Sequence, residues 1–72
     1  MKGSEFLRML KRLAHRRGWD FEWRPDRGKG SHGIVVMNGH KTVLRYLKDE
    51  VKTGTFHGML KQLGINENDL HS

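Results

Sequence analysis

The sequence predicts an α+β fold, a three-stranded antiparallel sheet with both helices packed on one of its faces. Residues 3–17 and 55–63 place apolar side chains at helical spacing, and three short segments with strand character lie between them. Asn38-Gly39, the strongest short signal for a β-hairpin, separates the second of these segments from the third. We therefore expect one domain over residues 1–72, in the order α-β-β-β-α and with two layers.

The size and composition of the chain exclude several classes of protein. A chain of 72 residues buries only about 60% of its unfolded surface, so its core is thin. The absence of cysteine excludes disulfides and thiolate metal sites. The sequence has no apolar run long enough to span a membrane and no apolar signal segment at its start. We therefore expect a soluble, cytoplasmic protein without a membrane partner.

The charge of the chain is positive and unevenly distributed. Fourteen lysines and arginines against eight acids give a net charge of +6. Residues 1–17 carry +5 and residues 32–48 carry +3, whereas the last eleven residues carry −2. This distribution favours a polyanionic partner such as a nucleic acid. A basic surface also serves solubility or an acidic protein partner, and charge alone does not separate these roles.

Local signals define the first helix and the first strand. Ser4 is expected to cap a helix over residues 3–17, and Gly18 is expected to end it. Its basic face could follow a phosphate backbone or simply be solvated. The aromatic residues Trp19, Phe21 and Trp23 then alternate with acids, which predicts a half-buried strand whose rings belong mainly to the core. Residues 24–31 follow as a basic, glycine-rich loop.

The Asn38-Gly39 turn predicts the pairing of the next two strands, over residues 32–37 and 40–47. If the turn has two residues, Met37 pairs with His40 and the rest of the register follows.

This register gives the most specific geometric prediction of the sequence. It places His32 opposite Arg45, and it puts His32, Lys41 and Arg45 on one face of the hairpin. A bulge of one residue would remove the cluster.

The C-terminal part predicts a second helix and a final turn. Thr55 is expected to cap the helix, and Gly64 is expected to end it. Asn66 can cap one last turn, with Ile65 and Leu70 placed as a hydrophobic staple.

Gly28-Lys29-Gly30-Ser31-His32 is the stretch most suited to chemistry on a phosphodiester. Glycines on both sides of Lys29 allow positive φ values and a close approach of phosphate. Ser31 adds a hydroxyl donor, and His32 adds an imidazole, which can serve as a base or an acid. By position and register, Lys29, Lys41 and Arg45 are candidates for binding phosphate and stabilising transition-state charge. The same composition is also common in ordinary surface loops.

Several short motifs, in the same order and spacing, resemble the HicA family of toxins, the endoribonucleases of bacterial type II toxin–antitoxin pairs. The matching stretches are Lys2-Gly3-Ser4-Glu5-Phe6, Gly30-Ser31-His32, Asn38-Gly39, Asp49-Glu50-Val51-Lys52, Gly54-Thr55-Phe56 and Met59-Leu60-Lys61-Gln62-Leu63-Gly64-Ile65. They span nearly the whole chain. Two positions depart from the family: Leu44-Arg45-Tyr46 stands where many relatives have Val-Pro, and Gly33 stands where many have histidine or a large residue.

The resemblance implies a fold, an activity and partners. The fold would be that of a double-stranded-RNA-binding domain, and the activity cleavage of mRNA with His32 as the catalytic histidine. Ser31 is a further RNA-binding candidate because of its hydroxyl donor and its place in the basic loop, not because of the resemblance. A HicB-type antitoxin would neutralise the toxin, and contact with DNA would come only through that antitoxin.

RNA carries its own nucleophile, the 2′-hydroxyl, so a histidine and cations suffice for cleavage, and we expect neither a metal nor a cofactor. His40 is the histidine that could complete an acid–base pair with His32. Two other functions remain open, a non-catalytic RNA-binding module of the same fold and a small DNA-binding or adaptor protein. The last is disfavoured because the sequence has no helix-turn-helix spacing.

Overall fold

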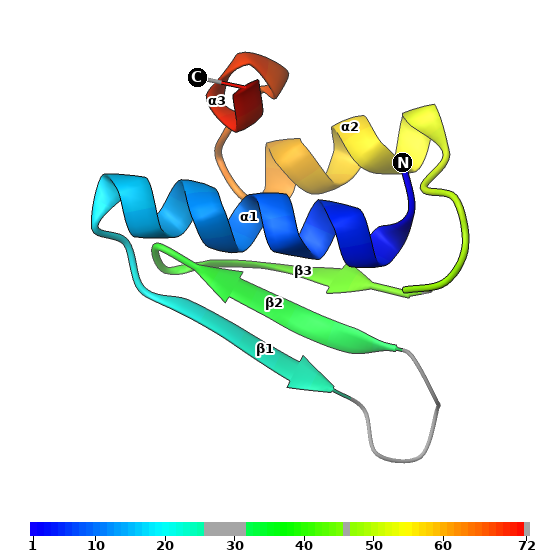
Figure 1. Cartoon of the computed structure of the whole chain (residues 1–72), viewed down its shortest axis with the longest axis horizontal. Helices are drawn as coiled ribbons and strands as arrows, with labels where there is room; N and C mark the ends of the chain where they lie inside the picture. Colours follow the sequence, from blue (N-terminus) through cyan, green and yellow to red (C-terminus); the bar gives the residue numbers. More distant parts are fainter. Residues whose placement is uncertain (26–31, 46, 72) are drawn as a thin grey trace.

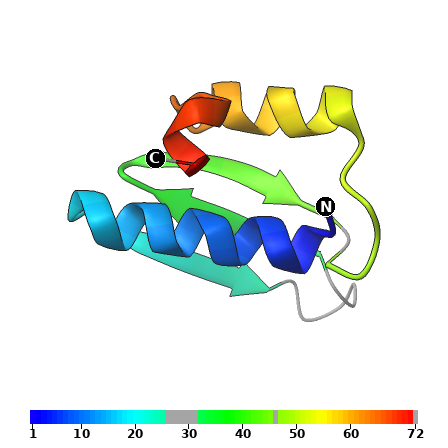
Figure 2. The ribbon, with the colours of Figure 1, turned by 45° about the horizontal axis from the view of Figure 1, so that its top comes forward.

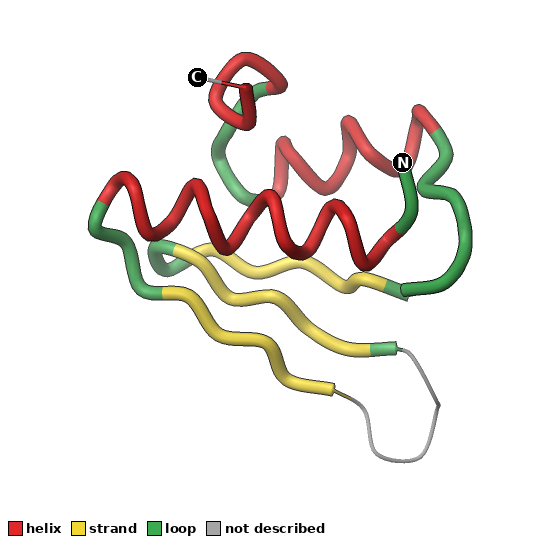
Figure 3. Tube along the Cα trace, in the orientation of Figure 1, coloured by secondary structure: helices red, strands yellow, loops and turns green. Residues whose placement is uncertain are grey.

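The computed structural model describes residues 1–25, 32–45 and 47–71, which form two layers (Figure 1). Helices make up one layer and strands the other, as the tube in Figure 3 shows. The elements, in chain order, are α1 (Gly3–Arg17), β1 (Phe21–Pro25), β2 (Gly33–Met37), β3 (His40–Leu44), α2 (Thr53–Gln62) and α3 (Glu67–His71). This is the predicted α+β class and order, with the last turn forming the short helix α3.

The sheet has the predicted antiparallel hairpin at its centre. Its order is β1-β2-β3, and β2 pairs with β3 from Met37 opposite His40 to Gly33 opposite Leu44. The turn has two residues with positive φ, 52° at Asn38 and 79° at Gly39, the conformation that matches the twist of the two strands. The predicted register is confirmed. β3 ends at Leu44, however, three residues earlier than expected.

The two faces of the sheet differ in what covers them. Val35, Met37 and Leu44 point into the helical layer and are buried, whereas Ile34 and Val43 on the other face are 38% and 50% exposed. In Figures 1 and 2 the helices lie on one side of the strands only. We call the second side the open face; it carries the alternate residues of each strand.

β1 is longer at its C-terminal end than the sequence predicted. Arg24 and Pro25 were expected in a loop, but both belong to the strand and pair with β2. Proline is tolerated here because β1 is an outer strand, where its missing N–H breaks no ladder. Trp19, Phe21 and Trp23 are half-buried against the core, as expected for rings that mainly support packing.

α1 has the predicted bounds but not the predicted cap. It begins after an extended Lys2, and no side chain caps it, so the role expected of Ser4 is wrong. Backbone groups of a distant segment take that role: the Gly3 N–H donates to the carbonyl of Asp49 over 3.0 Å, and the Ser4 N–H donates to that of Leu47 over 2.8 Å. These bonds also fix the chain that leads from β3 to α2.

α2 and α3 complete the helical layer. α2 begins at Thr53 without a side-chain cap, so the expected cap at Thr55 is wrong as well. The cap predicted for Asn66 is confirmed, because its Oδ1 accepts from the Asp69 N–H over 3.1 Å and its own N–H donates to Asp69 Oδ2 over 2.9 Å.

Side chains of α1 contact both α2 and α3 and so hold the helical layer together. The Phe6 ring meets Phe56 of α2 edge to face at 5.3 Å between centroids. Arg16 donates to the Asp69 carbonyl over 3.0 Å, and Arg17 donates to Asp69 Oδ1 over 3.1 Å. Two cations of the basic helix therefore hold α3 in place. No helix in the described part of the chain is long and apolar enough to cross a membrane.

Candidate active site

His32 stands at the end of the central hairpin, immediately before β2, and is half-buried. Gly33 pairs with Leu44, so His32 and Arg45 follow as the next position beyond the paired ends. Both residues line one open cavity of about 440 Å³. The structure therefore brings together the two residues that the predicted register placed opposite one another.

The remaining predicted site residues fall elsewhere. Lys29 and Ser31 lie outside the described residues. Lys41 shares the open face and pairs with Val36, but it stands four residues from Arg45, about 13 Å along the strand, and does not line the cavity. Lys41 is therefore placed for a part of an extended ligand that lies outside this cavity.

Arg24 is a residue of this cavity that sequence reasoning missed. It lies opposite Ile34 on β1, so its side chain shares the open face with His32 and Arg45. Glu22, two residues earlier on the same strand, accepts two hydrogen bonds from Arg24, over 2.8 Å to Nε and 3.1 Å to Nη2. The period-two spacing of these opposite charges was the available signal.

The ion pair sets the position and charge of the Arg24 guanidinium. The hydrogen bonds from Arg24 lower the pKa of Glu22, and the same contact raises the pKa of Arg24, so both groups stay charged at neutral pH. Glu22 uses two of the five N–H donors that a guanidinium offers, which leaves three for a ligand. Arg24 can therefore bind an anion while Glu22 holds it in place.

Gly33 allows the strands to approach closely beside His32. A Cβ at this position would lie 2.7 Å from the Arg24 carbonyl oxygen and closer still to the indole of Trp23. The Trp23 ring thus occupies the space that a side chain at residue 33 would need. This packing gives a physical reason for glycine at residue 33.

His40 does not pair with His32. It lies at the turn end of β3, on the helical side of the sheet, where its imidazole is 3.2 Å from the position a Cβ of Gly64 would take. Acid–base chemistry in the cavity would thus depend on one described histidine. Among the described residues, no group of three or more histidines and acids is arranged to hold a metal ion.

Apolar side chains complete the open face between the cations. Ile34 and Val43 line the same cavity as His32 and keep much of their surface exposed. Such side chains can contact a nucleobase while the nearby arginines contact phosphate. The arrangement suits an anionic ligand with apolar parts.

Comparison of the chain with protein-family models gives no match, and comparison with characterised proteins or with solved structures gives none either.

Proposed function

We propose that this chain is a metal-independent endoribonuclease that cleaves mRNA with His32, and that it acts as the toxin of a HicA-type toxin–antitoxin pair. The observation that carries the proposal is the cavity shared by His32, Arg24 and Arg45. The net charge of +6 and the HicA-like motifs support it independently.

The chemistry assigns a role to each of these groups. His32 serves as the general base that removes the proton of the 2′-hydroxyl, or as the acid that protonates the leaving 5′-oxygen. The 2′-oxygen forms a bond to phosphorus, the P–O5′ bond breaks, and the products are a 2′,3′-cyclic phosphate and a 5′-hydroxyl. Arg45 and Arg24 stabilise the charge that develops on the phosphorane. Lys41 is placed to contact a neighbouring phosphate.

A pair of histidine variants tests the assignment. A general acid–base group contributes about 10²–10⁴-fold, so His32→Gln should lower the cleavage rate by at least about 100-fold. His40→Gln is the matched control, because it makes the same change on the other face of the sheet. The assay is cleavage of a labelled RNA by the purified proteins, with circular dichroism as the check of fold and mass spectrometry of the product ends.

Three outcomes separate the alternatives. Cleavage lost only in the His32 variant, with cyclic phosphate ends in the wild type, supports the proposal. A folded His32→Gln protein that cuts at the wild-type rate overturns it. RNA binding by all three proteins without any cleavage favours the non-catalytic RNA-binding module instead.

The partner under this proposal is a HicB-type antitoxin. The basic surfaces of α1 and the hairpin attract an acidic protein as readily as RNA, so we expect the antitoxin to cover His32 and exclude RNA. The complex should weaken as salt rises. An inhibited complex that binds RNA with unchanged affinity would contradict steric exclusion.

A further inference from the structure

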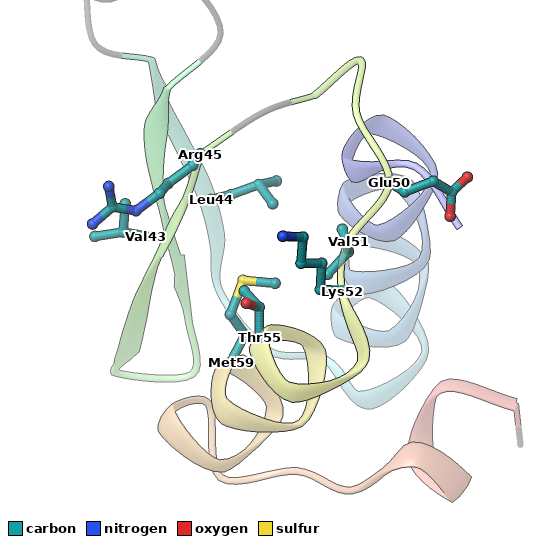
Figure 4. Close-up of a pocket in the computed structure, with 8 residues that line it drawn as sticks. All are labelled: Val43, Leu44, Arg45, Glu50, Val51, Lys52, Thr55 and Met59. Carbon is teal, nitrogen blue, oxygen red and sulfur yellow. The ribbon is translucent and has the colours of Figure 1, made fainter.

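A second cavity lies beside β3, on the side away from β2. Its volume is about 270 Å³, and it is lined by the end of β3, the segment before α2 and the first half of α2 (Figure 4). Leu44, Val51 and Met59 give it an apolar floor. β3 is an outer strand of the sheet, so this cavity runs along a strand edge.

The hydrogen-bond pattern shows which backbone groups face that edge. The Asn38 N–H donates to the Asp20 carbonyl over 3.0 Å, in register with the β1–β2 ladder. Bonding direction alternates along an antiparallel strand, so Val35 and its neighbours two residues away bond to β3. The β3 residues that pair with them direct their backbone N–H and C=O groups toward β2. The N–H and C=O groups of Lys41 and Val43, which alternate with these residues, therefore point outward. Within the described residues, neither of these two has a backbone hydrogen bond to another segment on that side.

The outer edge of β3 is open only in part. Near the turn, α2 lies close, since the Thr42 hydroxyl donates to the Gln62 side chain. Toward Arg45 the helix diverges from the strand and the cavity opens. The opposite edge of the sheet is protected differently, because β1 ends at Pro25, the single proline of the chain.

The charges around this open edge are mainly positive. Lys41 and Arg45 are exposed on the open face of β3. Lys52 projects its ammonium into the cavity in Figure 4, while the carboxylate of Glu50 points away from it. That carboxylate accepts a hydrogen bond from the amino group of Met1 over 2.8 Å. A ligand at the edge would meet cations.

We propose that the outer edge of β3 docks an extended acidic segment of a partner protein, which adds to the sheet as a fourth strand. Its backbone bonds the outward groups of Lys41 and Val43, its apolar side chains enter the cavity, and its alternate acidic side chains face Lys41 and Arg45. RNA fits less well, because it lacks backbone N–H donors at strand spacing and gains little from an apolar floor. The inference does not depend on the proposed cleavage.

A synthetic peptide with the predicted alternation is the direct probe, acetyl-Glu-Leu-Glu-Val-Glu-Leu-Glu-amide. Titrated into the ¹⁵N-labelled protein, it should shift the amide signals of Lys41 and Val43 and slow their hydrogen exchange. The amides of Thr42 and Leu44, which face β2, should change less. A peptide of the same composition with its residues in scrambled order is the ligand control. Saturable binding without this alternation, or no binding, would overturn the proposal.

Protein variants test the backbone and charge contributions separately. Val43→Pro removes an outward N–H while leaving the β2–β3 ladder intact, so the peptide Kd should rise about tenfold, the equivalent of ~1.4 kcal/mol. Lys41→Glu should raise the Kd by roughly fivefold, because the attraction between residue 41 and an acidic side chain on the added strand becomes a repulsion. Lys11→Glu, on α1, makes the same change in net charge and should have little effect.

The variants also decide between occupants and guard against a folding artefact. Circular dichroism checks each fold, and if Val43→Pro unfolds, the two glutamate variants carry the test. If Lys41→Glu and Lys11→Glu weakened peptide binding equally, the effect would come from the net charge of the protein alone, and the proposal would be overturned. A single-stranded RNA that shifts the Val43 amide where the peptide does not would assign the edge to RNA and overturn it as well.

Discussion

Replacing Gly33 with alanine should destabilise the protein, because the structure leaves no room for a side chain at that position. The added Cβ would lie 2.7 Å from the Arg24 carbonyl oxygen, a separation that real Cβ contacts do not show. The carbonyl belongs to the neighbouring strand, and the Trp23 ring is packed against the core, so neither yields easily. The β1–β2 pair must therefore move apart at its open end.

The cost can be estimated from similar overpacking. Adding a methyl group to a tightly packed site costs about 1–3 kcal/mol. A domain of 72 residues has a free energy of unfolding of about 4–11 kcal/mol, so this is a large fraction. With a shift of about 4–8 °C per kcal/mol at this size, Tm should fall by roughly 4–24 °C. The rate of RNA cleavage should fall too, because the substitution displaces the backbone at residue 33, which is next to His32.

Gly58→Ala is the matched control, since a Cβ at Gly58 in α2 meets nothing within 4 Å. Replacing a glycine in a helix interior with alanine should stabilise the protein by about 0.5–1 kcal/mol. The two glycine-to-alanine substitutions should therefore change the free energy of unfolding in opposite directions. Thermal and urea denaturation followed by circular dichroism measures both. Trp23→Phe should rescue part of the Gly33→Ala loss, because a phenyl ring lacks the outer indole atoms. A Gly33→Ala protein as stable as the wild type would refute the packing argument.

Three further predictions concern charge and chemistry. The Asn66 backbone N–H and then Arg17 lower the pKa of Asp69 from its ordinary value of 3.8. A lowered folded-state pKa gives stability that is present above the unfolded value and lost as pH falls through the folded one. The urea midpoint gap between wild type and Asp69→Asn should thus shrink from pH 6 to pH 3, and a constant gap would contradict this. Arg45→Gln should weaken both RNA cleavage and peptide binding, whereas Val43→Pro should weaken peptide binding more than it weakens cleavage. If the two variants had equal effects in both assays, this would count against two separate surfaces. Cleavage should persist in EDTA because the 2′-hydroxyl is the nucleophile, and loss that magnesium restores would refute this mechanism.

The part of the site that could be predicted from the sequence depends on one turn. A two-residue Asn-Gly turn admits essentially one register, so the opposition of His32 and Arg45 followed from residues 38 and 39 alone. Arg24 could not be placed in the same way. The connection between β1 and β2 is too long to fix a register, and proline at the next position indicated a loop.

The predictions of side-chain caps at Ser4 and Thr55 were wrong for a different physical reason. Ser4 and Thr55 have good capping propensity, but propensity describes an isolated helix. In the folded chain the first N–H groups of α1 bond to carbonyls of residues 47 and 49, a tertiary contact with no local signal. At α3, where both partners are local, the prediction was correct.

β3 connects the two surfaces on which the functional proposals depend. Val43 and Arg45 line both the cavity of His32 and the cavity at the strand edge, because an outer strand has one flat face and one free edge. A phosphate beside His32 and an acidic side chain on an added strand would both seek the Arg45 guanidinium. One guanidinium cannot neutralise two separate anions fully, so each ligand would weaken the other. If both proposals hold, an acidic segment on β3 would inhibit cleavage by competition for a shared cation, even where it leaves His32 uncovered.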